Sequence, residues 1–434
     1  MSDVSVPEVE AYIAEATRSA WEVPGVLRDT PRRPVAGVGI IGAGTMGGGI
    51  AMNFAAAGIP VTLVETSQDA LDRGFGRIRA NYQRSADKGR FSHEEVEARI
   101  ARLSGTLDFN ALAGNDLVIE AVFEDMRVKK DIFARLETLM QPGAILATNT
   151  SALDIDEIAA VTARPGDVIG LHFFSPANVM KLVEVVRGER TSDDVVVTTM
   201  ELARRIGKVA VLVGVCPGFV GNRILRRRQE QANRLLAAGV MPWTIDTAIT
   251  GFGFRMGPFQ MTDLAGLDIG WSRGGSTGNP VRDALCEMGR RGQKTNAGFY
   301  DYDEDRRPAP SEVTERLVRE FSGGQAAAMG DDEIVETCIF PMINEAVKVL
   351  EDNKAQRASD IDVIWLNGYG WPREKGGLMY FADMVGAPAV LARMERLGAE
   401  DPSCTPARAL RTLAAGGGRF TELDFGGLKT GRER

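Results

Sequence analysis

The stretch VGIIGAGTMGGGIAMNFAAAGIPVTLVE, Val38–Glu65, decides the fold. It runs from a short apolar segment through a Gly-x-Gly-x-x-Gly turn (Gly42, Gly44, Gly47) and a helical segment to a second apolar segment that ends at Glu65. A glycine motif alone is weak evidence for a dinucleotide site, but this one follows an expected strand and begins an expected helix. The acidic residue comes about 20 residues further on, as in dinucleotide-binding βαβ units.

Each position in the turn has a physical reason. Gly42 permits the tight turn, Gly44 lets the backbone approach a pyrophosphate, and Gly47 lets the helix pack on the strand. Thr45 and Met46 begin the helix, whose N–H groups and positive dipole end favour phosphate groups. The motif therefore predicts a dinucleotide site.

Glu65 indicates which dinucleotide binds. Its carboxylate would accept hydrogen bonds from the adenosine ribose and repel a 2′-phosphate, which favours NAD over NADP. The alternative is an ordinary glycine turn followed by a solvated glutamate.

Beyond this stretch, short apolar runs alternate with helical ones from Val35 to about Cys216. Such alternation predicts a parallel sheet with helical crossovers. Before it, residues 1–34 read as an amphipathic helix and a proline-rich connector. After it, the sequence is mostly helical with Gly and Pro punctuation.

Two segments of the helical part resemble each other, Ile245–Gly266 and Ile361–Gly386. Both begin Ile-Asp, contain Gly-aromatic-Gly-aromatic and end Asp-x-x-Gly, which favours a duplicated helical domain over chance similarity. We therefore expect an α/β Rossmann-type NAD-binding domain followed by two tandem, related all-α domains. The expected limits are 1–34 for the helix and linker, 35–215 for the Rossmann domain, 216–325 for the first helical domain and 326–434 for the second.

Composition excludes several classes of protein. The chain of 434 residues is 44% hydrophobic and 25% charged, and no apolar run approaches the roughly 18 residues of a membrane span. The net charge of −8 argues against nucleic-acid binding. The four cysteines are widely separated, so we expect no metal site. Neither terminus carries a signal peptide or the usual peroxisomal tripeptide, and a cytoplasmic location is expected.

The chain contains two histidines. His172 lies in the apolar run of LHFFSPANVMKLVEVV, and Glu184 lies in the next apolar run of the same stretch. Two ionisable groups in adjacent apolar segments can satisfy each other, which predicts a base and its orienting carboxylate. A core histidine with a satisfied hydrogen bond is the alternative. His93, inside the capping box Ser92–Glu95, is expected at the surface.

The chain resembles a known family, the L-3-hydroxyacyl-CoA dehydrogenases, over nearly its whole length from about Pro34. It is most similar to the dehydrogenase portion of the multifunctional fatty-acid oxidation enzymes, without their enoyl-CoA hydratase domain. The motifs that carry the resemblance are GAGTMGGGIA, VIEAVFEDMRVKK, TNTSALDI, GLHFFSPANVMKLVEVV, GVCPGFVGNRIL and GYGWPREKGG.

The resemblance implies catalytic roles. His172 would be the general base, with Glu184 holding its tautomer, while Ser151 and Asn222 would hydrogen-bond the substrate. Read without the family, Ser151 is equally a turn hydroxyl and Asn222 a helix-start cap.

The resemblance also implies ligand contacts. Contacts to the nicotinamide ribose are expected from Ala121, Glu124, Lys129 and Asn149. For Glu124 and Lys129 the alternative is a solvated helix start. Lys88 and Arg90 would bind the phosphates of CoA, although such charges on a helical arm are as often solvated surface.

The implied activity is the reversible, NAD-dependent oxidation of a (S)-3-hydroxyacyl-CoA to a 3-oxoacyl-CoA, as in fatty-acid β-oxidation. We expect no hydratase activity. A monomer is plausible because the tandem helical repeat can cover an apolar face within one chain, and a dimer is possible. Two alternatives stay open: a dehydrogenase of a small free 3-hydroxy acid, and a non-catalytic NAD-binding scaffold.

Overall fold

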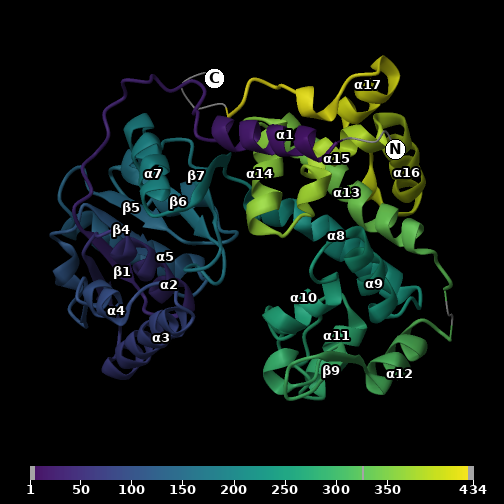
Figure 1. The fold of residues 1–434 in the computed structure, drawn as a ribbon, viewed down its shortest axis with the longest axis horizontal. Coiled ribbons are helices and arrows are strands. Elements are labelled where there is room, and N and C mark those ends of the chain that lie inside the picture. Colours follow the sequence, from purple (N-terminus) through teal and green to yellow (C-terminus); the bar gives the residue numbers. More distant parts are fainter. Residues whose placement is uncertain (1–4, 325–326, 429–434) are drawn as a thin grey trace. The chain divides into compact units, whose positions relative to one another are not determined.

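The computed structural model describes residues 5–324 and 327–428, which form two compact units (Figure 1). The first, the sheet unit, comprises residues 5–223, 349–369 and 421–428. The second, the helical unit, comprises the described residues of 224–348 and 370–420. These two units are defined by contacts within the structure and not by the domain limits expected from the sequence. Those limits stay a prediction. The chain ends on which the expected location partly depends, residues 1–4 and 429–434, lie outside the described residues.

An eight-stranded sheet forms the centre of the sheet unit, in the order β3-β2-β1-β4-β5-β6-β7-β8. The strands are β1 (Val38–Ile41), β2 (Val61–Val64), β3 (Leu103–Thr106), β4 (Leu117–Glu120), β5 (Ile145–Thr148), β6 (Val168–Phe173), β7 (Leu182–Arg187) and β8 (Val209–Gly214). β3, with the sequence LSGT, has no apolar run of its own. Every residue of β1, β4 and β5 is buried, which explains why these strands read as continuous apolar runs.

The expected parallel sheet is correct for six strands and wrong for one pairing. β3, β2, β1, β4, β5 and β6 run parallel, whereas β7 pairs antiparallel with β6 and parallel with β8. The connection from β6 to β7 is too short for a helical crossover, which takes about a dozen residues or more, so the chain turns straight back. The helix α7 (Asp193–Arg205) provides the crossover from β7 to β8.

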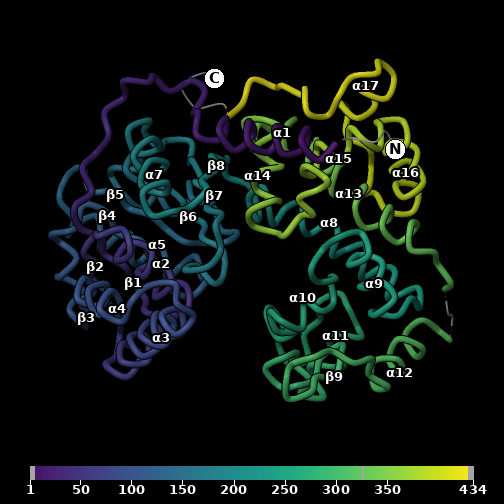
Figure 2. Tube along the Cα trace, in the orientation of Figure 1, coloured from purple at the N-terminus to yellow at the C-terminus, as the bar shows by residue number. Residues whose placement is uncertain are grey.

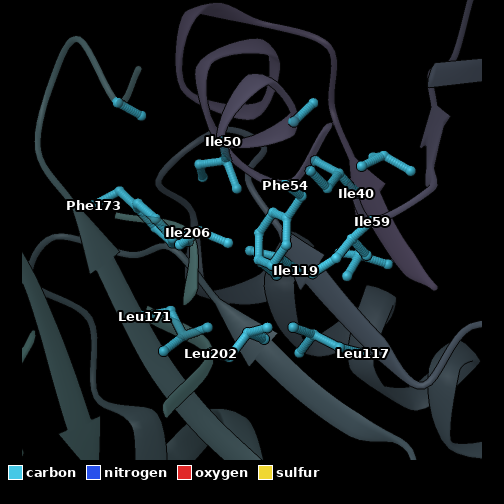
Figure 3. Close-up of a cluster of buried hydrophobic side chains, with 14 of the residues drawn as sticks. Ile40, Ile50, Phe54, Ile59, Leu117, Ile119, Leu171, Phe173, Leu202 and Ile206 are labelled. Atoms are coloured by element: carbon cyan, nitrogen blue, oxygen red, sulfur yellow. The ribbon is translucent and has the colours of Figure 1, made fainter. Parts of the chain in front are cut away.

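Helices of the sheet unit cover the sheet and bury a continuous apolar core. They are α2 (Thr45–Ala56), α3 (Gln68–Asp87), α4 (His93–Ile100), α5 (Met126–Leu139), α6 (Ile155–Ala159) and α7 (Asp193–Arg205). Figure 3 shows Ile40, Phe54, Leu171 and Leu202 in one cluster, drawn from β1, α2, β6 and α7. Each of these four side chains is at most 6% exposed. The core thus fixes the sheet against α2, the helix that begins at the glycine turn.

The N-terminal helix is also part of the sheet unit. α1 (Val6–Ser19) packs against α14 (Ala358–Gly368), as Figure 2 shows, and the Tyr12 hydroxyl donates to Asp362 Oδ2 at 2.6 Å. α14 packs in turn on β7 and β8. In the connector, the Arg33 guanidinium pairs with Asp167 and Asp194, each at 2.7 Å. The segment expected to be a linker is therefore anchored to the sheet unit.

The helical unit contains the whole of the first related segment and residues 370–386 of the second, whose residues 361–369 belong to the sheet unit. Its elements are most of α8 (Phe219–Ala237), α9 (Pro242–Phe252), α10 (Pro258–Ala265), α11 (Pro280–Glu287), β9 (Tyr300–Tyr302), β10 (Pro308–Pro310), α12 (Glu312–Phe321), most of α13 (Asp331–Glu351), α15 (Leu378–Val385), α16 (Ala387–Glu400) and α17 (Arg408–Gly416). Asp263 accepts the backbone N–H of Phe299 at 2.9 Å, and Asp383, in the same place in the second segment, accepts that of Phe420 at 2.5 Å. This shared use of an aspartate supports an internal duplication.

No helix within the described ranges combines the length and the apolar character that crossing a bilayer requires.

The glycine turn joins β1 to α2 as the sequence predicts. Gly42 has a φ of +98°, in the region that favours glycine. A Cβ on Gly47 would lie 1.8 Å from the Gly42 carbonyl oxygen, so no larger residue fits between helix and turn. A Cβ on Gly44 would meet nothing within 4 Å, and Thr45 and Met46 follow as the first residues of α2. The turn therefore leaves open space at the start of the helix.

We predict that Gly47→Ala lowers the free energy of unfolding by about 2–3 kcal/mol, because the new methyl group must displace α2 from the turn. Urea unfolding measures the loss. The matched control is Gly76→Ala in α3, where a Cβ meets open space, and it should be neutral or stabilising by about 0.5–1 kcal/mol. Wild-type stability of the Gly47 variant would contradict the packing described here.

Candidate active site

His172 and Glu184 lie directly opposite each other on β6 and β7. His172 Nδ1 and Glu184 Oε2 are 2.7 Å apart, and the two residues are 5% and 0% exposed. Because a carboxylate only accepts hydrogen bonds, Nδ1 carries the proton, which leaves Nε2 of the neutral ring as a proton acceptor. The contact that the sequence predicted is present.

The start of α8 supplies a second hydrogen-bonding partner for the Glu184 carboxylate. Its Oε1 accepts the backbone N–H of Gly221 at 2.9 Å. Phe219, at the same helix start, is buried and has a φ of +50°, a left-handed conformation that costs a non-glycine residue on the order of 1–3 kcal/mol. Its ring lies 5.6 Å from that of His172, and the Phe174 ring lies 4.4 Å away, measured between centroids. The imidazole is therefore held by one hydrogen bond to a carboxylate and by two aromatic contacts.

Ser151 and Asn222, far apart in the sequence, come together here. Asn222 Nδ2 lies 3.4 Å from the backbone carbonyl oxygen of Ser151. The Ser151 hydroxyl donates to Glu124 Oε1 at 3.0 Å, and the same oxygen accepts the Ser151 N–H and the Thr150 hydroxyl, each at 2.7 Å. The loop after β5 is thus tied to the loop after β4.

The environment of Glu124 keeps its carboxylate ionised. Burial, the largest single effect, raises the pKa of Glu124, but hydrogen bonds from Thr150 and Ser151 and the charge of Lys129 lower it below the usual value overall. The carboxylate therefore accepts hydrogen bonds at neutral pH.

Lys129 does not lie at a solvated helix start. Its side chain is 1% exposed, and its ammonium pairs with Glu120 at 2.8 Å and lies 3.5 Å from Glu124 Oε2. Glu120 also accepts the Thr148 hydroxyl at 2.6 Å and the Val122 N–H at 2.7 Å. In this structure the ammonium is engaged by carboxylates, so any contact of Lys129 with a nicotinamide ribose stays a prediction.

Ala121 and Asn149 directly follow β4 and β5, at the carboxyl ends of those strands. Asn149 Oδ1 accepts the Phe173 N–H at 2.9 Å, which links the ends of β5 and β6. The Ala121 carbonyl oxygen lies 2.9 Å from where a Cβ of Gly42 would be. The strand order reverses between β1 and β4, and open α/β sheets bind ligands at such a point.

Glu65 is tied to the glycine turn. Its Oε1 accepts the Ala43 N–H at 2.8 Å and its Oε2 accepts the Thr66 N–H at 3.0 Å. The residue is partly exposed, and its contact with an adenosine ribose stays a prediction. An acid beside the turn and the open space at Gly44 together fit a dinucleotide.

The remaining predicted residues lie at the surface. Lys88 and Arg90 are exposed just after the last residue of α3, and their contact with CoA stays a prediction. His93 is exposed at the start of α4, capped by Ser92, as expected. His93 Nδ1 lies 2.9 Å from Gln83 Nε2.

Sequence reasoning missed three residues of this cluster. For Glu120 a signal exists: it is an acid inside the apolar run DLVIEAV, and a buried carboxylate needs a partner, as at Glu184. Thr150 gave no signal beyond its place next to Ser151. Tyr369, whose hydroxyl lies 2.8 Å from Asn222 Oδ1, comes from the second repeat and gave none.

We predict that Lys129→Met lowers the free energy of unfolding by about 3–5 kcal/mol, because it leaves the Glu120 carboxylate buried without its cation. Chemical denaturation measures the loss. The double variant Glu120→Gln/Lys129→Met, which removes both charges, should recover most of the stability. Equal stability of the single and double variants would contradict a buried pair.

Comparisons with known proteins agree with this geometry. Residues 37–216 match the family model of the 3-hydroxyacyl-CoA dehydrogenase NAD binding domain, so the cofactor is NAD. The model of the C-terminal domain of the same family matches twice, over residues 218–302 and 334–423. The double match agrees with the repeat seen in the sequence.

Similar curated proteins are multifunctional. The chain is 43% identical to the peroxisomal bifunctional enzyme of Cavia porcellus and 41% identical to that of Homo sapiens, over 94% of its own length and 60% of theirs. The chain thus spans 60% of the length of these relatives.

Two solved structures are similar over most of both chains. The dehydrogenase part of multifunctional enzyme 1 from C. elegans has a TM-score of 0.68 and 33% identity, covering 93% of this chain and 96% of that one. The 3-hydroxybutyryl-CoA dehydrogenase from Escherichia coli has a TM-score of 0.75 and 29% identity, covering 88% and 99%. With the family models matched over both parts of its length, the chain belongs to the 3-hydroxyacyl-CoA dehydrogenase family.

Proposed function

We propose that this protein catalyses the reversible, NAD-dependent oxidation of a (S)-3-hydroxyacyl-CoA to the 3-oxoacyl-CoA, as in fatty-acid β-oxidation. The observation that carries the proposal is the buried pair of His172 and Glu184, with Nδ1 and Oε2 at 2.7 Å. Alcohol oxidation needs a proton acceptor, and a neutral imidazole with its Nδ1 proton directed to a carboxylate provides one at Nε2.

The chemistry then divides between protein and cofactor. Bound NAD supplies the hydride acceptor. His172 takes the hydroxyl proton of the substrate, and Glu184 stabilises the resulting imidazolium without becoming protonated. In the reverse direction His172 returns the proton to the carbonyl oxygen. Because Glu184 is fully buried, its charge acts on the imidazole with little screening by water.

Ser151 and Asn222 orient the substrate in this proposal. Both lie in the cluster that links the loop after β5 to the start of α8, and both carry hydrogen-bonding groups suited to a hydroxyl or thioester oxygen. For the CoA phosphates we propose Lys88 and Arg90, the exposed cations just after α3. Ala121, Glu124, Lys129 and Asn149 are proposed to surround the nicotinamide ribose.

Two properties of the whole protein are also proposals. We propose that a monomer is viable, because the chain carries both helical segments that could cover each other's apolar faces. The relatives named above are peroxisomal by name, so the cytoplasmic location expected from the sequence is not confirmed and stays a prediction.

We predict that His172→Gln lowers kcat for the NADH-dependent reduction of acetoacetyl-CoA by about 100- to 10,000-fold, because the general acid–base group is lost. The dissociation constant of NADH, measured by fluorescence titration, should change less than about twofold. His93→Gln, the other histidine of the chain, is the matched control and should keep wild-type turnover. Full activity of the His172 variant would refute the proposed chemistry.

We predict that NADH binds at least about tenfold more tightly than NADPH, because Glu65 repels a 2′-phosphate beside the glycine turn. Parallel fluorescence titrations with the two cofactors measure the ratio. Glu65→Gln removes the negative charge and should reduce the ratio of the NADPH dissociation constant to the NADH dissociation constant. Tighter binding of NADPH to the wild-type protein would show that the role given to Glu65 is wrong.

A further inference from the structure

Tyr369 stands at the end of α14, in the second repeat, yet it reaches the cluster around His172. Its hydroxyl lies 2.8 Å from Asn222 Oδ1. Both residues belong to the sheet unit. A residue from the repeat that contains no base-bearing motif is therefore in direct contact with a proposed substrate-binding side chain.

The direction of this hydrogen bond follows from the groups around Asn222. The Ser151 backbone carbonyl can only accept, so the Asn222 amide must turn its Nδ2 toward Ser151. This leaves Oδ1 facing Tyr369, and the phenol must donate. The tyrosine hydroxyl thus selects one of the two orientations of the amide.

Packing fixes the tyrosine ring on three sides. It stacks on Trp365 with centroids 4.6 Å apart and meets Phe174 edge-on at 5.3 Å, and Phe174 also contacts the His172 ring. A Cβ on Gly221 would lie 2.4 Å from the Tyr369 hydroxyl oxygen, so the glycine of the VGNR motif makes room for this ring. The hydroxyl has little freedom to move away from Asn222.

The phenol stays protonated under working conditions. Burial, and after it the negative charge of Glu184, raises the pKa of Tyr369 well above the usual value of 10. A protonated phenol is the form that can donate to an amide oxygen.

Resting on the function proposed above, we infer that Tyr369 is a positioning residue of the active site. It holds the Asn222 amide so that the second N–H of its Nδ2, the one not directed at the Ser151 carbonyl, is presented to the oxygen atoms of the acyl-CoA. Donation to the amide oxygen also polarises the amide and strengthens its N–H as a donor. The second helical repeat therefore completes the substrate site instead of serving only as a structural copy.

The test is a double-mutant cycle in the full-length protein, with Tyr369→Phe and Asn222→Ala. In the presence of Asn222, Tyr369→Phe should lower kcat/KM for acetoacetyl-CoA about tenfold, the upper range for one hydrogen bond. In the Asn222→Ala background the same change should cost less than about twofold. Rates are expressed per NADH-binding site, so an incompletely folded fraction does not count.

Two further measurements separate positioning from packing. Calorimetric titration of acetoacetyl-CoA in the presence of NAD, where both partners are oxidised and no turnover occurs, should show weaker binding by about threefold or more in Tyr369→Phe. The NADH dissociation constant should stay within about twofold. The matched control is Tyr12→Phe, which removes a hydroxyl bonded to Asp362 on the same helix, away from Asn222, and should leave kcat/KM unchanged.

An equal loss in both backgrounds would mean that Tyr369 acts through packing, and wild-type kinetics and binding of Tyr369→Phe would mean that it does not act at all. Either result overturns the inference. If His172→Gln is inactive while Tyr369→Phe behaves as wild type, only the role of Tyr369 fails. If His172→Gln retains full activity, the proposed function itself fails.

Discussion

The antiparallel pairing of β6 with β7 is the constraint on which the candidate site depends. It places His172 directly opposite Glu184 in the buried interior of the sheet, where an unpaired carboxylate would cost several kcal/mol. Both oxygens of Glu184 are used, one by the imidazole and one by the Gly221 N–H. The hydrogen bond to Gly221 connects the sheet to the start of α8. The register of two strands thus fixes the tautomer of the proposed base and the position of the helix that carries Asn222.

A second buried charge holds the neighbouring strand ends together. Glu120, at the end of β4, receives hydrogen bonds from Lys129 on α5, from Thr148 on β5 and from the backbone of Val122. Glu124 does the same for the loop after β5 through Ser151. Each carboxylate accepts several hydrogen bonds, which restrain these loops beside the proposed nicotinamide site. Rigid donors and acceptors are what hydride transfer between a positioned alcohol and a cofactor requires.

The first helices of the two related segments belong to different units of this chain. In the first copy α9, which contains the Ile-Asp start at Ile245 as α14 contains that at Ile361, belongs to the helical unit. In the second copy α14 and Tyr369 belong to the sheet unit, where α14 packs against β7, β8 and α1. The two related segments therefore lie in different environments, and the second reaches the cluster around His172 through Phe174. The small residue at Gly221 is the counterpart that this environment requires.

The sequence by itself determined what depends on local pattern. Gly42 and Gly47 specify the turn between β1 and α2, because only glycine fits the backbone angle of the first and the space around the second. The pairing of His172 with Glu184 was also predictable, because each is an ionisable group in an apolar run and neither can be buried alone.

Only the tertiary structure decided which groups meet across long separations. The burial of Lys129 against Glu120 and the contact of Tyr369 with Asn222 both depend on side chains brought together by packing. Helical periodicity and charge spacing do not encode such contacts. In the sequence, Lys129 fits a solvated helix start equally well, and Tyr369 fits a repeat with a purely structural role. Whether Lys88 and Arg90 meet a phosphate likewise depends on a ligand, and their exposed position alone does not decide it.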